Sequence, residues 1–232
     1  MHIAVISDVH GNLEALDAVL ADASGVDAYW LLGDLVAHGP RPAECVRRVR
    51  ALPGVVAVRG NTDRYTLTSP PDPVMVASID WPRTALSVDD LAGLGGLPVE
   101  ARPRAGVLMV HASPGRDDGP GLDPHTSDAD LVPAFASADA DLVLVGHTHH
   151  PDSRVLAGKL VVNPGSVSLP RTSDALTRYA ILTSTGTGWS VEHRTVPYDR
   201  AAVLADLAAG DHPSADWLSE KLTSPWGAVG GE

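Results

Sequence analysis

The chain has 232 residues, of which 44% are hydrophobic and 20% charged, a composition that predicts a globular protein with one sizeable core. Its formal net charge of −12 argues against nucleic-acid duplex binding, because duplexes are bound by basic surfaces. A phosphate-bearing small molecule remains compatible with this charge, because bound metal ions can invert the local field. The single cysteine, Cys45, excludes an intrachain disulfide framework.

The same features predict a cytoplasmic protein. One cysteine fits a reducing compartment. The first residues run directly into a predicted strand, and we see no signal peptide before it. No apolar stretch approaches the ~20 residues that a membrane-spanning helix needs. We therefore expect no membrane partner, and the sequence gives no indication of the oligomeric state.

The first half of the chain predicts repeating β–α units. In the first helix, Leu13, Leu16 and Val19 form an apolar stripe, and Asn12 is a suitable N-cap. Cys45 lies on the apolar face of the second helix, where we expect a packed core thiol. The expected strands are 3–7, 27–32 and 55–58, and the expected helices are 12–23 and 43–52.

The second half is less repetitive. Residues 63–98 look irregular, with a loop at 70–73 and a short helix at 88–94. A strand at 107–110, a loop, a helix at 128–138 capped by Ser127 and a strand at 141–145 follow. We then expect an antiparallel meander of strands 160–162, 178–182 and 189–196, with a hairpin turn at 185–188. Two helices, near 201–209 and 215–222, complete a single domain of residues 1–223, and 224–232 are expected to form a flexible tail.

Five short peptides place metal-ligand side chains where apolar runs end, which is where predicted strands end. In open α/β sheets, ligands bind at the carboxyl ends of the strands. A single histidine at such a place is more often structural than functional. Their joint occurrence predicts one shared metal centre. The candidate ligands are Asp8, His10, Asp34, Asn61, His111, His147 and His149.

The types of these side chains restrict the metal. Carboxylate and imidazole groups without thiolate suit Mn²⁺, Fe or Zn²⁺, and the set is too rich in nitrogen for Ca²⁺ or Mg²⁺. We expect two divalent ions, with manganese favoured and iron or zinc as the alternatives. Two ions about 3.5–4 Å apart can bind a phosphoryl group and generate a hydroxide for in-line attack.

The successive motifs Asp8-Val9-His10, Gly33-Asp34, Gly60-Asn61-Thr62-Asp63, His111 and Gly146-His147-Thr148-His149 resemble those of the calcineurin-like metallophosphoesterase family. The peptides 7–12 and 163–166 are most similar to the family's small bacterial and archaeal phosphodiesterases. The resemblance implies an α/β fold, a four-layer α/β/β/α sandwich of two mixed β-sheets flanked by helices. It also implies two ions bridged by Asp34, one bound also by Asp8, His10 and His149, the other also by Asn61, His111 and His147.

The sequence departs from the family pattern at two positions. Many members have a histidine after the Gly-Asn pair, which contacts the phosphate, and here that residue is Thr62. Phosphatase members pair that histidine with an aspartate, and here that position is Ala37. The usual general acid, typically worth 10²–10⁴-fold, is therefore missing, which favours substrates with good leaving groups. His38 is a candidate substitute, although a loop histidine that merely packs is the more common case.

These observations predict a metal-dependent phosphoric ester hydrolase, most favourably a phosphodiesterase or nucleotide hydrolase. The expected substrate is a small phosphodiester or nucleotide, with Asp34 and Asn61 as catalytic residues and Thr62 and His38 as further candidates. The alternatives are a non-catalytic metal-binding scaffold of the same fold, and a phosphomonoesterase or protein phosphatase. The loop 115–126 either contacts the substrate through Arg116, Asp117, Asp118 or His125, or is solvated, which we favour for the two aspartates.

Overall fold

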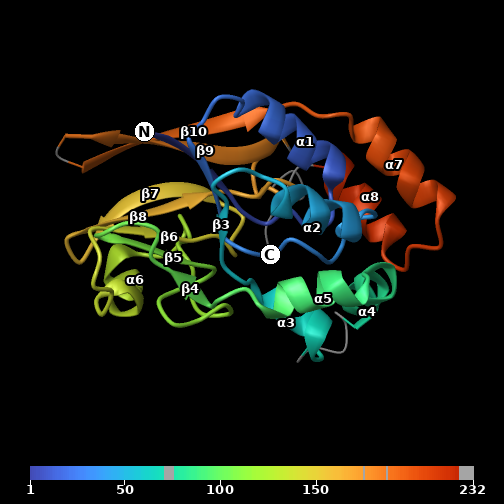
Figure 1. Ribbon diagram of the computed structural model, residues 1–232, viewed down its shortest axis with the longest axis horizontal. Coiled ribbons are helices and arrows are strands. Elements are labelled where there is room, and N and C mark those ends of the chain that lie inside the picture. Colours follow the sequence, from blue (N-terminus) through green and yellow to red (C-terminus); the bar gives the residue numbers. More distant parts are fainter. Residues whose placement is uncertain (71–75, 175, 187, 225–232) are drawn as a thin grey trace.

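The computed structural model describes residues 1–70, 76–174, 176–186 and 188–224, and these form two five-stranded sheets with helices around them (Figure 1). The strands are β1 (His2–Ile6), β2 (Ala28–Leu31), β3 (Val56–Ala57), β4 (Glu100–Ala101), β5 (Val107–Val110), β6 (Leu142–Leu144), β7 (Pro151–Leu156), β8 (Lys159–Pro164), β9 (Thr177–Thr185) and β10 (Gly188–Val196). The helices are α1 (Leu13–Asp22), α2 (Pro42–Arg50), α3 (Asn61–Leu67), α4 (Val76–Ala85), α5 (Val88–Gly95), α6 (Asp128–Phe135), α7 (Arg200–Ala209) and α8 (Ala215–Thr223).

Both sheets are mixed: the first is antiparallel on the β10-β9 side only, and the second is antiparallel at both edges. The first sheet has the order β10-β9-β1-β2-β3, in which β1, β2 and β3 are parallel. The second has the order β4-β5-β6-β8-β7, in which β5, β6 and β8 are parallel. Because the parallel strands of a sheet run in one direction, their carboxyl ends meet at one edge.

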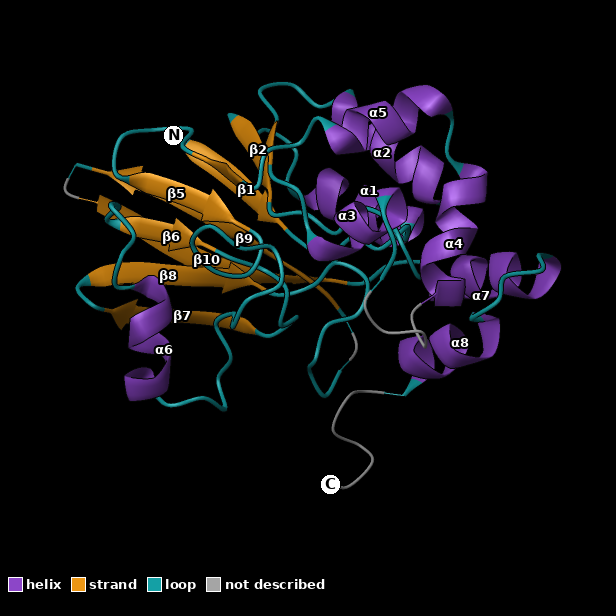
Figure 2. Ribbon diagram, turned by 90° about the horizontal axis from the view of Figure 1, so that it is seen from below, coloured by secondary structure: helices purple, strands orange, loops and turns teal. Residues whose placement is uncertain are grey.

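Three apolar layers hold the sandwich together. Trp30, Met109 and Leu144 belong to a buried cluster between the two sheets. On the outer face of the first sheet, Leu16 of α1 and Val46 of α2 pack against its strands. The outer face of the second sheet is covered by α6, and Figure 2 shows this helix apart from the others, beside β7 and β8. The arrangement is the expected four-layer α/β/β/α sandwich.

The expected β–α units are confirmed, with boundaries shifted by one or two residues. The side chain of Asn12 accepts a hydrogen bond from the N–H of Ala15 and so caps α1 as expected. Ser127 caps α6 in the same way. Cys45 is fully buried, and burial raises the pKa of its thiol.

The predicted antiparallel meander is wrong. β8 lies in the second sheet beside β6, whereas β9 crosses to the first sheet and pairs with β1. Alternating apolar residues show that a segment is a strand, but they do not show which sheet it joins. The hairpin between β9 and β10 is confirmed by the pairing of Thr185 with Gly188, and residue 187 between them lies outside the described residues.

Four elements were not expected: α3, α4, and the strands β4 and β7. Most of α3 and all of α4 lie in the segment 63–98, and Pro82 within α4 hides the helical pattern in the sequence. Strand β7 begins with Pro151 and forms an exposed edge, where proline is tolerated and apolar alternation is weak. Residues 71–73 of the expected loop, and 225–232 of the expected tail, lie outside the described residues.

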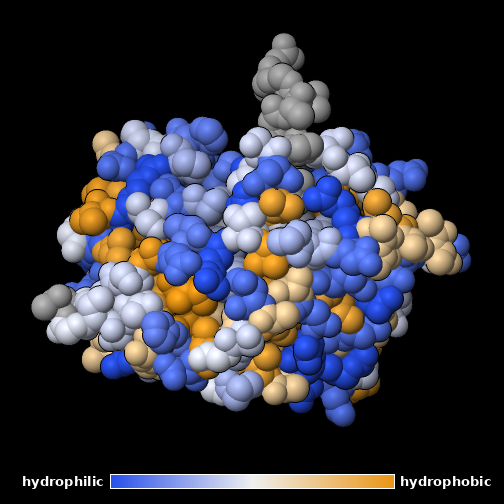
Figure 3. All heavy atoms as spheres, turned by 90° about the horizontal axis from the view of Figure 1, so that it is seen from above, coloured by the Kyte–Doolittle hydropathy of each residue, from blue (hydrophilic) through white to orange (hydrophobic). Residues whose placement is uncertain are grey.

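Within the described part of the chain, no helix is both long and apolar enough to cross a membrane. The face seen in Figure 3 intersperses hydrophilic and hydrophobic residues.

Candidate metal centre

The structure brings all seven candidate ligands to one place, the edge at which the parallel strands of both sheets end. Asp8 and His10 follow β1, and Asp34 follows β2. Asn61 opens α3 after β3, and His111 follows β5 directly. His147 and His149 lie in the loop after β6. Both sheets thus supply candidate ligands, and these converge at strand ends, as the strand-end pattern predicts.

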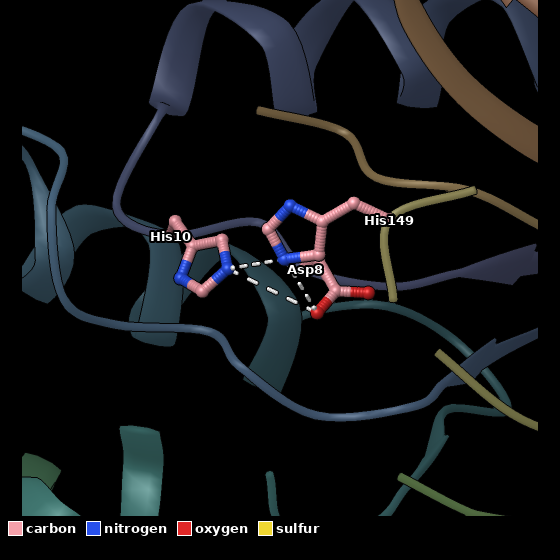
Figure 4. Close-up of side chains that lie close together, drawn as sticks. All are labelled: Asp8, His10 and His149. Atoms are coloured by element: carbon pink, nitrogen blue, oxygen red, sulfur yellow. Dashed lines mark hydrogen bonds and ion pairs between the residues drawn. The ribbon is translucent and has the colours of Figure 1, made fainter. Parts of the chain in front are cut away.

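The first group consists of Asp8, His10 and His149 (Figure 4). The Nε2 atoms of His10 and His149 lie 3.1 Å apart. Asp8 Oδ1 lies 3.3 Å from His149 Nε2 and 3.9 Å from His10 Nε2. Ligands about 2.0–2.2 Å from a common ion are separated by roughly 3–3.5 Å. The group therefore has the spacing of a donor set around one ion.

The second group surrounds Asn61. Its Oδ1 atom lies 3.1 Å from His111 Nε2 and 3.1 Å from His147 Nδ1. Asp34 Oδ2 lies 3.4 Å from His111 Nε2 and 3.8 Å from His10 Nε2 in the first group. One carboxylate oxygen of Asp34 therefore faces both groups, which is the geometry that a bridging ligand requires.

Three of the four histidines are oriented by backbone carbonyls. The Nδ1 atoms of His10, His111 and His149 lie 3.4, 2.6 and 2.8 Å from the carbonyl oxygens of Val36, Leu32 and Leu169. A carbonyl oxygen can only accept, so in each ring Nδ1 donates. The lone pair of the neutral ring then lies on Nε2, the atom directed at the cluster. This arrangement is typical of histidines that bind metals.

Asp8 provides a test of whether this donor set fits a cation. Its side chain is fully buried, and its Oδ1 atom has no hydrogen-bond partner among the described residues. A buried carboxylate oxygen without a partner is costly unless a cation binds it. The residues present therefore fit a divalent ion.

The electrostatics of the metal-free cluster are those of a charge-dense buried site. Burial raises the pKa of Asp8, but His149 and His111 outweigh it and lower the pKa to about 2. Burial lowers the pKa of His10 to about 4. Burial also lowers the pKa of His111, but the carboxylates of Asp34 and Asp8 outweigh burial and raise this pKa to about 10. His111 thus serves as the cation of the metal-free centre.

Backbone strain is concentrated at the same residues. Asp8, His10, Asp34, His147 and His149 all have positive φ, between 47° and 69°. Residues other than glycine rarely adopt this conformation, and its cost is accepted mainly at functional sites. The strain turns the chain sharply after each strand and directs successive side chains into the cluster.

Asp63 is a residue whose role the sequence analysis missed. Its buried carboxylate accepts hydrogen bonds from the N–H groups of Asp34, Leu35, Val36 and Gly60, at 2.9, 2.9, 3.3 and 2.9 Å. Burial and the charge of Asp34 raise the pKa of Asp63 to about 7, against the donors, which favour the ionised form. Its position three residues after Gly60, where a capping acid stands, was the available signal.

Glycine is required where these two loops meet. A Cβ atom at Gly60 would collide with the Asp34 carboxylate. One at Gly33 would collide with the backbone of Gly60. The backbone at Gly60 can therefore approach the carboxylate of Asp34 only because neither Gly33 nor Gly60 has a side chain.

The turn 163–166 supports the loop after β1 and the loop after β6, which both carry candidate histidine ligands. Asn163 Nδ2 donates to the carbonyl oxygen of Gly146, at 2.8 Å, and to Thr148 Oγ1, at 2.9 Å. Ser166 Oγ donates to the carbonyl oxygen of Asp8. One turn thus fixes the loop after β1 and the loop after β6 relative to each other.

Thr62 and His38 have different surroundings. Thr62 is buried, its hydroxyl donates to the carbonyl oxygen of Val36, and its N–H donates to Asp34 Oδ1. The ring of His38 lies 4.9 Å from that of His10, between centroids. Burial, and then His10, lower the pKa of His38 to about 3. Thr62 therefore orients Asp34, and His38 stands beside the cluster in its neutral form.

The expectation that Asp117 is solvated is wrong. Asp117 is buried, and Arg64 of α3 binds its carboxylate through Nε and Nη2, at 2.8 and 2.7 Å. Asp118 is exposed, and it also accepts a hydrogen bond from Arg64. The ion pair fastens this part of the loop to α3, which fits a structural role.

The sequence profile of the calcineurin-like phosphoesterase superfamily domain matches residues 1–187. Because the match spans most of the chain, and the fold and the strand-end motifs agree with it, the chain belongs to the calcineurin-like phosphoesterase superfamily. This family uses divalent metals, in agreement with the two groups of candidate ligands.

Relatives and solved structures support this membership. The chain is 30% identical to the uncharacterized protein MJ0912 of Methanocaldococcus jannaschii, over 95% of this chain and 96% of that protein. It is 27% identical to the phosphodiesterase YfcE of Escherichia coli, over 74% of this chain and 82% of the relative. The crystal structure of a metallophosphoesterase from Sphaerobacter thermophilus superposes with a TM-score of 0.82 at 30% identity, covering 97% of this chain and 98% of that one.

Proposed function

We propose that this chain is a dinuclear metal-dependent phosphodiesterase or nucleotide hydrolase. The observation that carries the proposal is the position of Asp34 Oδ2, which faces His10 in one group of ligands and His111 in the other. Similarity to a phosphodiesterase over most of the chain supports the preference for diesters.

In this proposal Asp8, His10, Asp34 and His149 hold one ion, and Asp34, Asn61, His111 and His147 hold the other. When bound, the two ions would polarise the phosphoryl oxygens and activate a water for in-line attack on phosphorus. The ligand types suit manganese, with iron or zinc as the alternatives. Thr62 keeps the bridging carboxylate oriented through its N–H, and the substrate phosphate lies between the two groups.

His38 is proposed to contact the substrate phosphate in place of the histidine that Thr62 replaces. Its ring lies beside that of His10, and its buried Nδ1 atom has no hydrogen-bond partner among the described residues. The change His38→Ala is expected to lower kcat for a diester by tenfold or more, within the ~10²–10⁴-fold range of such groups. A smaller loss would show that His38 only packs.

The function is tested with metal-stripped protein. Bis-p-nitrophenyl phosphate and p-nitrophenyl phosphate are offered side by side, with Mn²⁺, Fe²⁺, Ni²⁺, Zn²⁺ or Mg²⁺ added back. We expect metal-restored turnover that is faster for the diester, and its loss in Asp34→Asn, because the negative charge shared by both groups is removed. No turnover with any ion, despite measured metal binding, would favour the scaffold alternative. Near-normal turnover by Asp34→Asn would refute the dinuclear arrangement.

A further inference from the structure

A pocket of about 550 Å³ lies beside the candidate metal centre, a volume in the range of small-molecule sites. His38 forms one wall, and residues 212–217, from the start of α8 and the segment before it, form another. Ser78 of α4 completes the lining. Three segments far apart in the sequence therefore enclose one space.

A row of aromatic rings connects this pocket to the metal centre. The ring centroids of His149 and His10 are 5.0 Å apart, those of His10 and His38 are 4.9 Å apart, and those of His38 and Trp217 are 5.3 Å apart. His10 and His149 are candidate ligands, so the pocket begins one ring away from them. Trp217 is 39% exposed, which leaves part of its indole surface available to a ligand.

The chemistry of the walls suits a neutral planar group. Asp216 is the one residue with a formal charge among the described lining residues, and it would repel a phosphate. His212 Nδ1 accepts a hydrogen bond from the N–H of Ser214, so the proton of its neutral ring lies on Nε2. That Nε2–H is buried without a partner among the described residues, and the ring contacts Trp81, with the centroids 4.4 Å apart and the ring planes tilted by 53°. The pocket thus offers an aromatic surface, the exposed part of the Trp217 indole, with little formal charge around it.

We propose that this pocket binds an aromatic group of the substrate, a nucleobase, which stacks on Trp217 while the phosphate lies at the metal centre. The inference rests on the proposed function, because it takes the phosphate to occupy that centre. Nucleobases suit the site because they are planar and uncharged, and stack on aromatic side chains such as Trp217.

The position of the pocket explains how substrate preference could differ within one family. The family profile ends at residue 187, whereas α7, α8 and the segment between them lie beyond it. The metal centre and the His38 wall of the pocket are therefore built by the shared part of the chain, whereas Trp217 and His212 belong to the part that the profile does not include.

Calorimetry on the manganese-loaded protein tests the inference without requiring turnover. Adenosine 5′-monophosphate and ribose 5-phosphate carry the same phosphate, and they differ in the base. We expect the nucleotide to bind at least about tenfold more tightly. Trp217→Ala should remove most of that difference and leave ribose 5-phosphate binding unchanged, whereas Trp217→Phe should keep it. Val155→Ala, at an exposed position of β7, is the control and should behave as wild type.

Equal binding of the two ligands by the wild-type protein would overturn the inference, and so would weak or absent binding of both. A loss of affinity for both ligands in Trp217→Ala would also overturn it, since it would show a general disturbance of the centre. A nucleotide preference without diester hydrolysis would refute the proposed function and support nucleobase binding in the pocket. Diester hydrolysis without a nucleotide preference would support the proposed function and refute nucleobase binding.

Discussion

Asp63 shows how a residue that touches no candidate ion can control the centre. Its carboxylate binds four N–H groups, three of which belong to the loop that carries Asp34. In Asp63→Asn, one end of the side chain becomes an NH₂ group that faces donors. We expect a loss of about 1–3 kcal/mol in the free energy of unfolding, measured by urea denaturation, because buried N–H groups lose their acceptor.

The same variant should bind metal about 10–100-fold more weakly, the usual effect of changing a group that orients a ligand. Asp118→Asn is the matched control, because Asp118 is exposed and lies outside both ligand groups, and it should change neither quantity. Unchanged stability and metal affinity in Asp63→Asn would mean that the loop conformation does not depend on this carboxylate.

His111 gives the centre a pH dependence with a definite sign. Its pKa in the metal-free protein is raised from 6.5 to about 10, so the ring is protonated at pH 8 and must lose its proton to bind an ion. Metal binding should therefore release protons, and the apparent affinity should rise with pH up to about 10. In the metal-free protein the charged ring stabilises the fold below pH 6.5, and this stabilisation is lost as the pH rises through about 10.

Titration calorimetry in two buffers that differ in ionisation enthalpy measures the released protons. Asp123, His125 and His150 form a further, partly exposed group that could hold a metal ion. His125→Ala removes one of its side chains and is the control, because it should leave the proton release at the main centre unchanged. Metal affinity that does not vary between pH 7 and 9 would contradict the assignment of His111 as a protonated ligand.

At the scale of the elements, the candidate ligands could be read from the sequence because each follows a short apolar strand. Apolar runs such as those before Asp8 and His111 mark buried parallel strands, and chain direction alone then brings their ends together. The fold class followed from the motifs carried by these strand ends. Neither inference required knowledge of long-range packing.

The remaining features depend on contacts between distant segments. Asp63 reads as an ordinary capping residue until its contacts with the loop after β2 are seen. Trp217 and His212 lie about 180 residues after His38, and no local pattern relates them. Strand β9 was recognised as a strand, but its place beside β1 is decided by tertiary packing. Short local patterns therefore reveal the candidate ligands, whereas the residues that orient them and the residues of the neighbouring pocket are brought together only by the fold.

The turn after β8 carries a prediction at this scale. Asn163 joins the loop after β6 to the second sheet through hydrogen bonds to Gly146 and Thr148. Asn163→Ala should therefore lower thermal stability, by about 1–3 kcal/mol in unfolding free energy, and should weaken metal binding, because His147 and His149 lose their support. Ser153→Ala, on the exposed edge strand β7, is the control for removing a polar side chain nearby. Metal affinity equal to that of wild type in Asn163→Ala would show that the histidine loop holds its conformation unaided.

For the whole molecule, the centre is also the place where the two sheets are joined. The first sheet supplies Asp8 and Asp34, and the second supplies His111 and His147. Ions bound between them would link the halves of the sandwich, and would neutralise carboxylates that are fully buried. A ligand that binds only the folded state stabilises it by about 2.7 kcal/mol at a concentration of 100 Kd.

Metal removal should therefore lower the stability of the entire fold. For a chain of this size, 1 kcal/mol shifts Tm by about 2–4 °C, so we expect a chelator to lower Tm by roughly 5–10 °C. Differential scanning calorimetry before and after chelation measures the shift, and adding Mn²⁺ back should reverse it. Asp34→Asn serves as the control, because a protein that binds both ions weakly should show little change on chelation. An unchanged Tm in the wild type, with ions shown to be bound beforehand, would mean that the sheets are held together by their apolar interface alone.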